Sequence, residues 1–399
     1  MKEILKKIKP SKDEQAHFKL VTTSFITKLN KNLKNAEAIL GGSGAKDTWL
    51  AHQHDVDIFV LFKDSKNISD ILDKVLRKTF KEKIDRVHGS RDYFQLEYNN
   101  IQFEVVPILK ISKAEQAQNI TDISPLHSKW VNKQGKKIKD EIRLTKQFCK
   151  ANRLYGAESH IGGFSGYILE IITIYYGSFS KVLEAAVKWK PKTTIDSSNF
   201  YKNKDIFMEV NTSKLLSPLI VIDPVDKSRN AAAALSLEKF KQLKSLAKQY
   251  LKSPNVEHFQ LKPFLFPKKN GVHIIKIEIQ PLKGKRDVVG SKIVKVFEHL
   301  KRKLINFQIK ETAWDTENTL YFRIKIKELP KHLIQQGPPI SMEEAVKNFK
   351  KKNKLTYIEN GIVYAKITPP IRDINSFTNN VFKDKYVTER VKKINASFY

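Results

Sequence analysis

Apolar runs alternate with amphipathic stretches along the first 110 residues. Residues 36–40, 58–62, 94–98 and 101–108 are short apolar runs, which are typical of buried strands. Apolar residues recur every three or four positions in 13–33 and again in 68–84, which predicts two amphipathic helices; the second has the stripe Ile71, Leu72, Val75, Leu76 and Phe80. Asn99-Asn100 separates the last two strands and suits a tight hairpin turn with positive φ.

The pattern becomes helical from Pro125. Helical periodicity covers four stretches, which are 138–153, 166–176, 180–189 and 235–251. A polar stretch between them, 190–207, predicts a loop or small hairpin, and the apolar run 219–222 predicts a short buried strand.

Strand patterns return after Pro254. We expect strands at 272–279, 307–311 and 320–326 and a helix at 289–304. This order predicts an α+β layer in which a helix packs on an antiparallel sheet. Ser341 with Glu344 three positions later predicts a capping box that opens a helix at 343–352, and short strands with loops are expected from Lys354 onward.

The net charge narrows the class of binding partner. The 399 residues carry a formal net charge of +31, spread along the chain and not confined to a tail. Such an excess favours a large polyanion as partner, with RNA or DNA ahead of an anionic membrane. A general bias toward lysine in the source proteome remains an alternative.

Cysteine content and hydropathy exclude several classes of protein. The single cysteine, Cys149, excludes a disulfide framework and a thiolate zinc site and is expected to be a small core residue. The N-terminus lacks the apolar core of a signal peptide. The most apolar predicted helix, 166–177, is interrupted by Glu170 and is too short to span a bilayer, so we expect an intracellular, cytoplasmic protein with no membrane partner.

The candidate chemistry begins at Gly41-Gly42-Ser43-Gly44, a turn followed by a predicted short helix at 46–49. Asp55 and Asp57 follow at the mouth of a buried strand, and alternate residues of a strand face the same way, about 6.6 Å apart. Glu104 lies in the predicted strand 101–108. A phosphate-binding turn, two carboxylates on one strand and a third on a neighbouring strand predict a pair of Mg²⁺ ions for nucleotide transfer.

Each part has an ordinary structural alternative. A glycine-rich segment is most often a loop, an Asp-x-Asp pair is most often a solvated strand end, and Glu104 alone would pair with a lysine. The order of all three favours the functional interpretation. His127, Lys146, Tyr155 and Arg229 lie in helical surroundings where each is individually more typical of structure, with Asp223 or Asp226 as a salt-bridge partner for Arg229.

A resemblance extends this interpretation across about 370 residues. The chain resembles the class I, archaeal-type CCA-adding enzymes, which are tRNA nucleotidyltransferases. The matching motifs occur in family order: Gly42-Ser43 with Thr48-Trp49-Leu50, Asp55-Val56-Asp57-Ile58-Phe59, Glu104-Val105-Val106-Pro107, Pro125-Leu126-His127 with Lys129-Trp130, Tyr155-Gly156-Ala157-Glu158, Gly163-Phe164-Ser165-Gly166-Tyr167, Asp223-Pro224-Val225-Asp226 with Arg229-Asn230, and Ile358-Glu359-Asn360-Gly361.

The resemblance implies an α+β multidomain protein. Its parts are a polymerase-β-type nucleotidyltransferase head (1–125), a helical neck with the nucleotide-base pocket (126–254), an α/β body with a mixed antiparallel sheet (255–335) and a short tail (336–399). Body and tail are expected to bind RNA. The implied reaction is template-independent addition of C, C and A to the 3′ end of tRNA from CTP and ATP, in tRNA maturation and repair.

The resemblance also implies residue roles. By motif position, Asp55, Asp57 and Glu104 are expected to bind two Mg²⁺ ions, and Arg229 is expected to select the base together with RNA phosphate groups. The residues expected to contact the triphosphate and sugar of the nucleotide are Gly42, Ser43, Lys46, His127, Lys146 and Tyr155. The tRNA partner is expected to be held at its acceptor stem and elbow.

The chain departs from the family pattern at several positions. Glu104 stands where aspartate is usual, which lengthens the third metal ligand by one methylene. Lys46 stands where arginine is usual, which removes bidentate phosphate binding, and Gly44 stands where tyrosine is usual. The chain ends at Tyr399, so we expect a shortened tail that affects tRNA affinity more than chemistry.

Two other functional classes remain as alternatives. One is another RNA 3′-terminal nucleotidyltransferase, such as a poly(A) polymerase or an oligoadenylate synthase. The other is a non-catalytic RNA-binding protein on this fold, against which the cost of an unused carboxylate cluster argues. The sequence leaves open full or partial CCA addition, a second CCA on unstable tRNAs, and the oligomeric state, a homodimer included.

Overall fold

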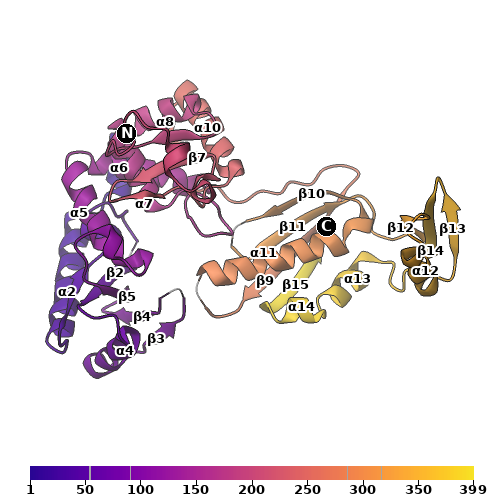
Figure 1. The fold of residues 1–399 in the computed structure, drawn as a ribbon, viewed down its shortest axis with the longest axis horizontal. Coiled ribbons are helices and arrows are strands. Elements are labelled where there is room, and N and C mark those ends of the chain that lie inside the picture. The colour runs from indigo at the N-terminus through magenta and orange to yellow at the C-terminus, as the bar shows by residue number, and fades with distance from the viewer. Residues whose placement is uncertain (54, 90, 285, 316) are drawn as a thin grey trace. The chain divides into compact units, whose positions relative to one another are not determined.

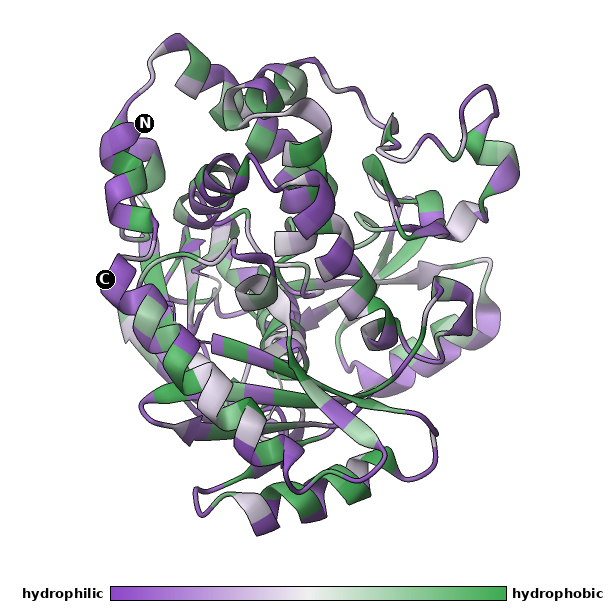
Figure 2. Cartoon of the chain, turned by 90° about the vertical axis from the view of Figure 1, so that its left-hand side faces the viewer, coloured by the Kyte–Doolittle hydropathy of each residue, from purple (hydrophilic) through white to green (hydrophobic). Residues whose placement is uncertain are grey.

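A computed structural model describes residues 1–53, 55–89, 91–284, 286–315 and 317–399 (Figure 1). The chain forms two compact units, Met1–Pro263 and Phe264–Tyr399. Among the described residues no helix is both long and apolar enough to cross a membrane. Many helices carry green and purple stripes in Figure 2, which is the appearance of amphipathic helices with one apolar face.

The first unit begins with a five-stranded sheet in the order β1-β2-β5-β4-β3. Its central pair, β2 (Asp55–Phe62) and β5 (Ile101–Leu109), is parallel, and its other pairs are antiparallel. Helices α2 (Lys12–Asn30) and α4 (Ile68–Thr79) share a hydrophobic core with this sheet. The remaining strands are β1 (Ala36–Leu40), β3 (Asp85–Val87) and β4 (Tyr93–Tyr98).

Most predicted elements of this sheet are confirmed, with four differences. Asn99 and Asn100 have φ of 49° and 60°, as the hairpin turn requires. Ile71 is 43% exposed, so the predicted stripe of α4 is wrong at that position, and Ile68 is buried instead. The predicted helix 68–84 is too long, because α4 ends at Thr79 and Phe80 lies just beyond it in an extended conformation. The predicted helix at 46–49 is also wrong, because helix α3 covers Gly42–Lys46 and ends where Asp47 takes a left-handed conformation. The short strand β3 was not predicted.

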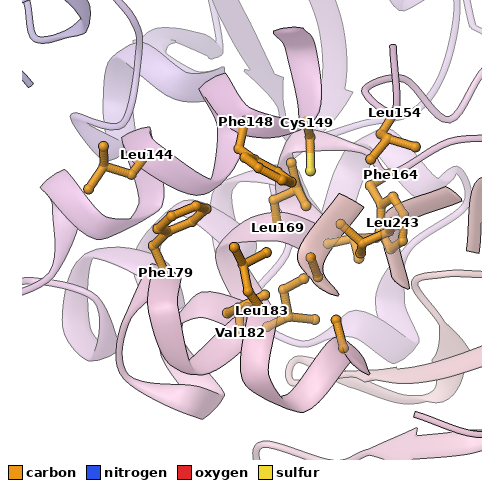
Figure 3. Close-up of a cluster of buried hydrophobic side chains, with 14 of the residues drawn as sticks. Leu144, Phe148, Cys149, Leu154, Phe164, Leu169, Phe179, Val182, Leu183 and Leu243 are labelled. Carbon is orange, nitrogen blue, oxygen red and sulfur yellow. The ribbon is translucent and has the colours of Figure 1, made fainter. Parts of the chain in front are cut away.

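Helices surround the second core of this unit. They are α1 (Lys2–Ile8), α5 (Ser124–Gln134), α6 (Lys139–Ala151), α7 (Gly166–Tyr176), α8 (Phe179–Lys188) and α10 (Leu237–Lys252). Figure 3 shows side chains of α6, α7, α8 and α10 interdigitating around Phe148, Leu169 and Leu183, with Cys149 buried among them as predicted. A three-stranded sheet, β6-β7-β8, joins Thr193–Ile195, Leu219–Asp223 and Asp226–Asn230, and a short α9 covers Ile206–Glu209 within the predicted loop region and just beyond it.

The second unit contains a four-stranded antiparallel sheet. Its strands β9 (His273–Pro281), β10 (Ile309–Trp314), β11 (Thr319–Ile324) and β15 (Val391–Phe398) lie in the order β10-β11-β9-β15. With α11 (Arg286–Lys303) after β9 and α13 (Ile374–Val381) before β15, the chain order is β-α-β-β-α-β. This is the ferredoxin-like arrangement, and it confirms the predicted helix-on-sheet layer.

A small module is inserted between β11 and α13. It consists of β12 (Leu333–Pro339), α12 (Glu343–Lys352), β13 (Thr356–Glu359) and β14 (Ile362–Ile367), with the sheet order β12-β14-β13. The two connecting segments pair with each other, since Leu329 N donates to Arg372 O at 2.9 Å and Ile374 N donates to Lys327 O at 2.9 Å.

Two C-terminal predictions are wrong. The residue that caps α12 is Met342, with no side-chain cap, because the helix begins at Glu343 and leaves Ser341 one position too far away. The region after 354 contains the helices α13 and α14 (Lys385–Thr388) in addition to strands.

Candidate active site

The glycine turn lies directly against the carboxylate strand. Gly41 N donates a hydrogen bond to the backbone oxygen of Asp57 at 2.7 Å. Gly42 has φ of +54°, and a Cβ at this position would lie 1.6 Å from Asp57 Oδ2. Both the backbone conformation and this close approach therefore require glycine. Ser43, half-buried, follows in the same turn.

The three predicted metal carboxylates lie on two neighbouring strands. Asp57 of β2 is in register with Glu104 of β5, and Asp55 is in register with Gln102. Paired positions of adjacent strands and alternate positions of one strand share a face, so the three carboxylates face the same side. As the side chains stand, the described part of the chain has no group of three or more His, Cys, Asp or Glu positioned to hold a metal ion.

Electrostatics single out Asp57. Burial raises the pKa of its carboxyl group above the ordinary value, Lys46 opposes this effect, and the neighbouring charge of Asp55 adds to it. Gln95 Nε2 lies 3.5 Å from Glu104 Oε2 across the β4–β5 ladder. Two carboxylates that disfavour each other's charge are a typical setting for a cation.

Next to the turn, one fully buried carboxylate binds two of the lysines that are predicted to contact phosphate. Glu170 of α7 is 0% exposed, and its Oε2 accepts from Lys46 Nζ at 2.7 Å. Its Oε1 accepts from Lys146 Nζ at 2.7 Å and from Thr48 Oγ1 at 2.7 Å. Lys146 Nζ also donates to Thr48 Oγ1 at 2.9 Å. We call these four residues the Glu170 cluster.

Arg143 fixes the segment that leaves the turn. This buried side chain on α6 donates to Trp49 O at 3.0 Å, to Asp47 O at 2.7 Å and to Asp47 Oδ1 at 2.6 Å. Arg143 also contacts Asp140 of its own helix. Residues 46–49 are therefore hydrogen-bonded both to α6, through Arg143 and Lys146, and to α7, through Glu170.

Tyr155 lies beside the Glu170 cluster. A Cβ at Gly166 would meet the Tyr155 hydroxyl at 2.6 Å and Lys146 Cε at 3.7 Å, so the absent side chain makes room for both. Burial raises the pKa of Tyr155, and the charges of Glu170, Glu158 and Asp57 add to this effect. Its hydroxyl therefore stays protonated and can donate a hydrogen bond.

A second group of predicted residues surrounds Asp223. Its Oδ2 lies 2.5 Å from Arg229 Nη1 and 3.0 Å from His127 Nε2, and its Oδ1 accepts from the Tyr167 hydroxyl at 3.0 Å. Burial opposes ionisation of Asp223, but the hydrogen bond from His127 and the charges of His127 and Arg229 outweigh it and lower its pKa to about 2. The salt-bridge partner foreseen for Arg229 is thus Asp223.

Tyr167 connects the two groups. Its ring stacks on His127 with centroids 4.0 Å apart, and Lys46 Nζ lies 5.6 Å from the centroid of the same ring. Tyr167 and Glu170 are three residues apart on α7 and therefore lie on neighbouring positions of one helix face. One helix thus supports both groups.

Two family models match the first unit. A model described as "tRNA nucleotidyltransferase, second domain" matches residues 140–260, and the Second Messenger Oligonucleotide or Dinucleotide Synthetase domain matches residues 1–143. Relatives match almost the whole chain: the CCA-adding enzyme of Nanoarchaeum equitans is 34% identical over 93% of this chain and 97% of its own length. The chain belongs to the CCA-adding enzymes. Those of Sulfurisphaera tokodaii and Methanocaldococcus jannaschii are 32% and 30% identical over 99% of this chain and over 91% and 94% of their own lengths.

Solved structures agree with this fold. A cytoplasmic RNA terminal U-transferase superposes with a TM-score of 0.52 at 15% identity, covering 66% of this chain and 97% of that one. The Cid1 poly(U) polymerase gives 0.51 at 14% identity, covering 65% and 97%. At this identity the likeness shows the nucleotidyltransferase fold, as expected for a CCA-adding enzyme with a polymerase-β-type head.

The structure brings the predicted residues of this CCA-adding enzyme into two adjoining groups. Lys46 and Lys146 belong to the Glu170 cluster, and Tyr155 lies beside it, while Asp57 lies against the turn. His127 and Arg229 both contact Asp223. Sequence reasoning did not foresee roles for Glu170, Arg143 or Tyr167. Glu170 had a signal, because a carboxylate inside an otherwise apolar helix needs a buried partner. Arg143 had none for its contact with the turn, since Asp47 and Trp49 are more than 90 positions away in sequence.

Proposed function

We propose that this CCA-adding enzyme adds C, C and A to the 3′ end of tRNA from CTP and ATP, without a nucleic-acid template and with release of pyrophosphate. The observation that carries the proposal is the 34% identity over 93% of the chain with a relative named CCA-adding enzyme. The Asp57–Glu104 register beside a glycine turn supports the chemistry.

Asp55, Asp57 and Glu104 are the residues that would hold two Mg²⁺ ions. The donors fit, because carboxylate oxygens are the ligands that Mg²⁺ prefers and because Asp57 lies in a site where its charge is disfavoured without a cation. Bound Mg²⁺ supplies a lower pKa for the RNA 3′-hydroxyl and neutralises charge on the leaving pyrophosphate. Glu104 has the reach to turn toward Asp57, since its side chain is one methylene longer than aspartate.

The chain's own residues bind and orient the nucleotide. Ser43 and the backbone of the turn bind phosphate oxygens, Lys46 and Lys146 supply positive charge, and Tyr155 donates a hydrogen bond. His127 contacts the triphosphate or sugar, and its ring is fixed by the Tyr167 stack and by Asp223. These contacts position the α-phosphate for attack, which accounts for much of catalysis in phosphoryl transfer.

Arg229 selects the base. C and A each present an amino donor beside a ring-nitrogen acceptor, whereas U and G present a carbonyl beside an N–H. A guanidinium only donates, so it pairs with the ring nitrogen and not with an N–H. Asp223 holds one end of Arg229 through Nη1, and the side chain remains 30% exposed. A phosphate of the tRNA 3′ end would accept from the amino group.

The proposal includes the partner and the division of labour along the chain. The head (1–125) carries catalysis, the neck (126–254) carries the base pocket, and the body (255–335) and tail (336–399) bind the tRNA acceptor stem and elbow. The reaction belongs to the cytoplasm. A monomer and a homodimer are distinguished by analytical ultracentrifugation of the enzyme with and without tRNA.

The deciding experiment is extension of a tRNA that lacks CCA, read at nucleotide resolution. CTP alone should add two C residues, CTP with ATP should complete CCA, and ATP alone should extend only a tRNA that already ends in CC. Long A or U tails, or oligoadenylates made without tRNA, would instead indicate another terminal nucleotidyltransferase. Addition of only C or only A would show that the enzyme synthesises only part of the CCA sequence.

A further inference from the structure

The Glu170 cluster is a buried arrangement of unequal charge. Lys46 and Lys146 contribute two ammonium groups, each 2.7 Å from the same carboxylate, and the side chains of Lys46, Lys146 and Glu170 are 11%, 4% and 0% exposed. One carboxylate balances one ammonium group, so the cluster itself keeps one positive charge, and the charge of Lys46 also acts on the nearby carboxyl group of Asp57. Burying two ammonium groups on one carboxylate is costly, which indicates that this arrangement serves more than the packing of α7.

The groups that face Lys146 come from three parts of the fold. Glu170 approaches from α7, Lys46 and Thr48 from the turn and the segment after it, and Arg143 from the same helix, α6. The pKa of Lys146 is lowered to about 8, because burial and the charges of Lys46 and Arg143 lower it by more than Glu170 raises it. Glu170 is thus the group that keeps this ammonium protonated at neutral pH.

The cluster lies directly behind the proposed phosphate turn. Lys46 is the last residue of α3, whose first residue, Gly42, touches Asp57. The charge of Lys46 acts on Asp57, and Tyr155 is influenced by both Glu170 and Asp57. The unbalanced positive charge is therefore next to the carboxylates, where a polyanionic leaving group would lie.

We propose that Glu170 is the positioning residue of the triphosphate site: it holds Lys46 and Lys146 in place and charged, and the positive charge that it leaves unbalanced is available to the triphosphate of CTP and ATP. This inference rests on the proposed function. Glu170 does not touch the nucleotide and acts through the two lysines.

The test compares the full-length enzyme with Glu170→Gln, Glu170→Asp and the control Glu141→Gln at pH 6 and pH 8. Glu141 is a carboxylate of the same helical core that accepts from Phe179 N, outside the cluster. Binding of inorganic tripolyphosphate is measured by calorimetry without tRNA, and KM for CTP and ATP is measured with tRNA.

We expect Glu170→Gln to raise KM for CTP and ATP and the Kd for tripolyphosphate about tenfold or more at pH 8. Most of the loss should be recovered at pH 6, because Lys146 without Glu170 loses its proton at a lower pH. Glu170→Asp keeps the charge but reaches less far, so a rise of a few-fold without a new pH dependence is expected. The ratio of CTP to UTP use and the affinity for tRNA should stay unchanged in both variants and in Glu141→Gln.

A merely structural role predicts a different result. Glu170→Gln would then lower the folded fraction and kcat together, with unchanged KM and no recovery at pH 6, and the inference would be overturned. Tighter tripolyphosphate binding would also overturn it, because Glu170 would be a competitor of phosphate. If Glu170→Gln does not fold, wild-type affinity in Glu170→Asp decides against the inference. Extension of tRNA by the wild-type enzyme tests the proposed function separately.

Discussion

At the scale of single residues, Asp57 is the position with the most constraints. Its backbone oxygen accepts from Gly41, its side chain fills the space that a Cβ at Gly42 would need, and its partner in the parallel ladder is Glu104. Burial raises its pKa, so its negative charge is held at a cost that a bound cation would remove.

Asp57→Asn should therefore abolish nucleotide addition without unfolding the protein. The amide keeps the shape of the side chain but removes the metal charge, and a loss of about a thousandfold in kcat/KM, or about 4 kcal/mol, is expected. Asp55→Asn should behave in the same way. Turnover near the wild-type level in Mg²⁺ for either variant would exclude the two-metal mechanism, and the thermal midpoint serves as the control for folding.

Arg229 combines a structural contact with free donors. Nη1 contacts Asp223, and in the part of the chain that the structure describes no other N–H group of this guanidinium has a protein acceptor. A salt bridge and base selection are compatible, because the bridge fixes the side chain and leaves donors for the base.

Arg229→Ala should lower kcat/KM for both CTP and ATP and reduce their advantage over UTP, while tRNA binding stays nearly unchanged. A site that hydrogen-bonds the edge of a base can discriminate between nucleotides by about 10⁴-fold, and loss of the donor can remove much of this discrimination. Lys214→Ala is a matched control, because Lys214 Nζ donates to Ser228 O on the same hairpin and does not contact Asp223. An unchanged ratio of CTP to UTP in Arg229→Ala would leave the salt bridge as the role of this residue.

At the scale of elements, α7 organises the site. Gly166 leaves room for Tyr155 and Lys146, Tyr167 stacks on His127, and Glu170 holds the two lysines. The short helix α3 and its N-cap residue, Gly41, form the turn. Neighbouring side chains leave no room for a Cβ at Gly41 or Gly42. A Cβ at Gly41 would lie 2.4 Å from the Phe59 ring, and one at Gly42 would displace Asp57.

Gly42→Ala should thus impair catalysis more than stability. Strain at positive φ and the clash with Asp57 together should cost about 1–3 kcal/mol of folding free energy, whereas movement of Asp57 should remove most activity. Gly177→Ala is the matched control: its φ is +87° with nothing within 4 Å of the added Cβ. Equal losses of activity in the two variants would show that backbone strain alone explains the effect.

How far the sequence predicts these elements depends on how local their causes are. The strands 36–40 and 101–108 and the Asn99-Asn100 turn follow from local pattern and are confirmed within a residue. The helix after the turn was misplaced, because contacts of Gly41 and Gly42 with β2 decide where α3 begins. The Glu170 cluster joins residues more than 120 positions apart, such as Lys46 and Glu170, so no spacing rule reveals it. The metal role of Asp55, Asp57 and Glu104 came from the residue pattern, the roles of His127, Lys146, Tyr155 and Arg229 came from the family resemblance, and all of them stay predictions.

At the scale of the whole molecule, charge dominates. The formal net charge of +31 exceeds what folding requires and suits a polyanionic partner. The inserted module contributes to it, since α12 has no buried residue and ends with Lys350, Lys351 and Lys352. Exposed lysines of this kind bind phosphates without reading sequence.

The affinity for tRNA should fall steeply with salt, by about 0.9 log unit per neutralised phosphate for each tenfold change in salt. Replacing Lys347, Lys350, Lys351 and Lys352 with Ala should reduce that slope without changing which nucleotide is added. Glu343→Gln with Glu344→Gln in the same helix is the control and should not reduce it. Filter binding between low and moderate salt provides the measurement, and a flat dependence would point to a small-molecule substrate.

Acid should destabilise the first unit in a defined range. The pKa of Glu170 is lowered to about 2, since its lysine partners outweigh burial, and that of Asp223 is lowered to about 2 by His127 and Arg229. Lowered folded-state values give stability that is present above the unfolded values near 4 and is lost as pH falls toward 2. At about 1.4 kcal/mol per pKa unit, Asp223 should contribute about 2 kcal/mol and Glu170 about 3 kcal/mol. Denaturant unfolding at pH 5, 4 and 3 measures this slope, and Asp223→Asn should flatten it; an equal slope in that variant would contradict the assignment.

The hydrogen-bonded junction of the inserted module bears on how this protein can be engineered. The segments that enter and leave the module are tied together by Leu329 N to Arg372 O and by Ile374 N to Lys327 O. A short linker could therefore replace the module at this junction. The four-stranded sheet would then keep the order of its strands, β10-β11-β9-β15. We therefore expect the module to be exchangeable: a foreign RNA-binding domain whose termini lie close together could be grafted at the same junction to give the enzyme a new RNA target.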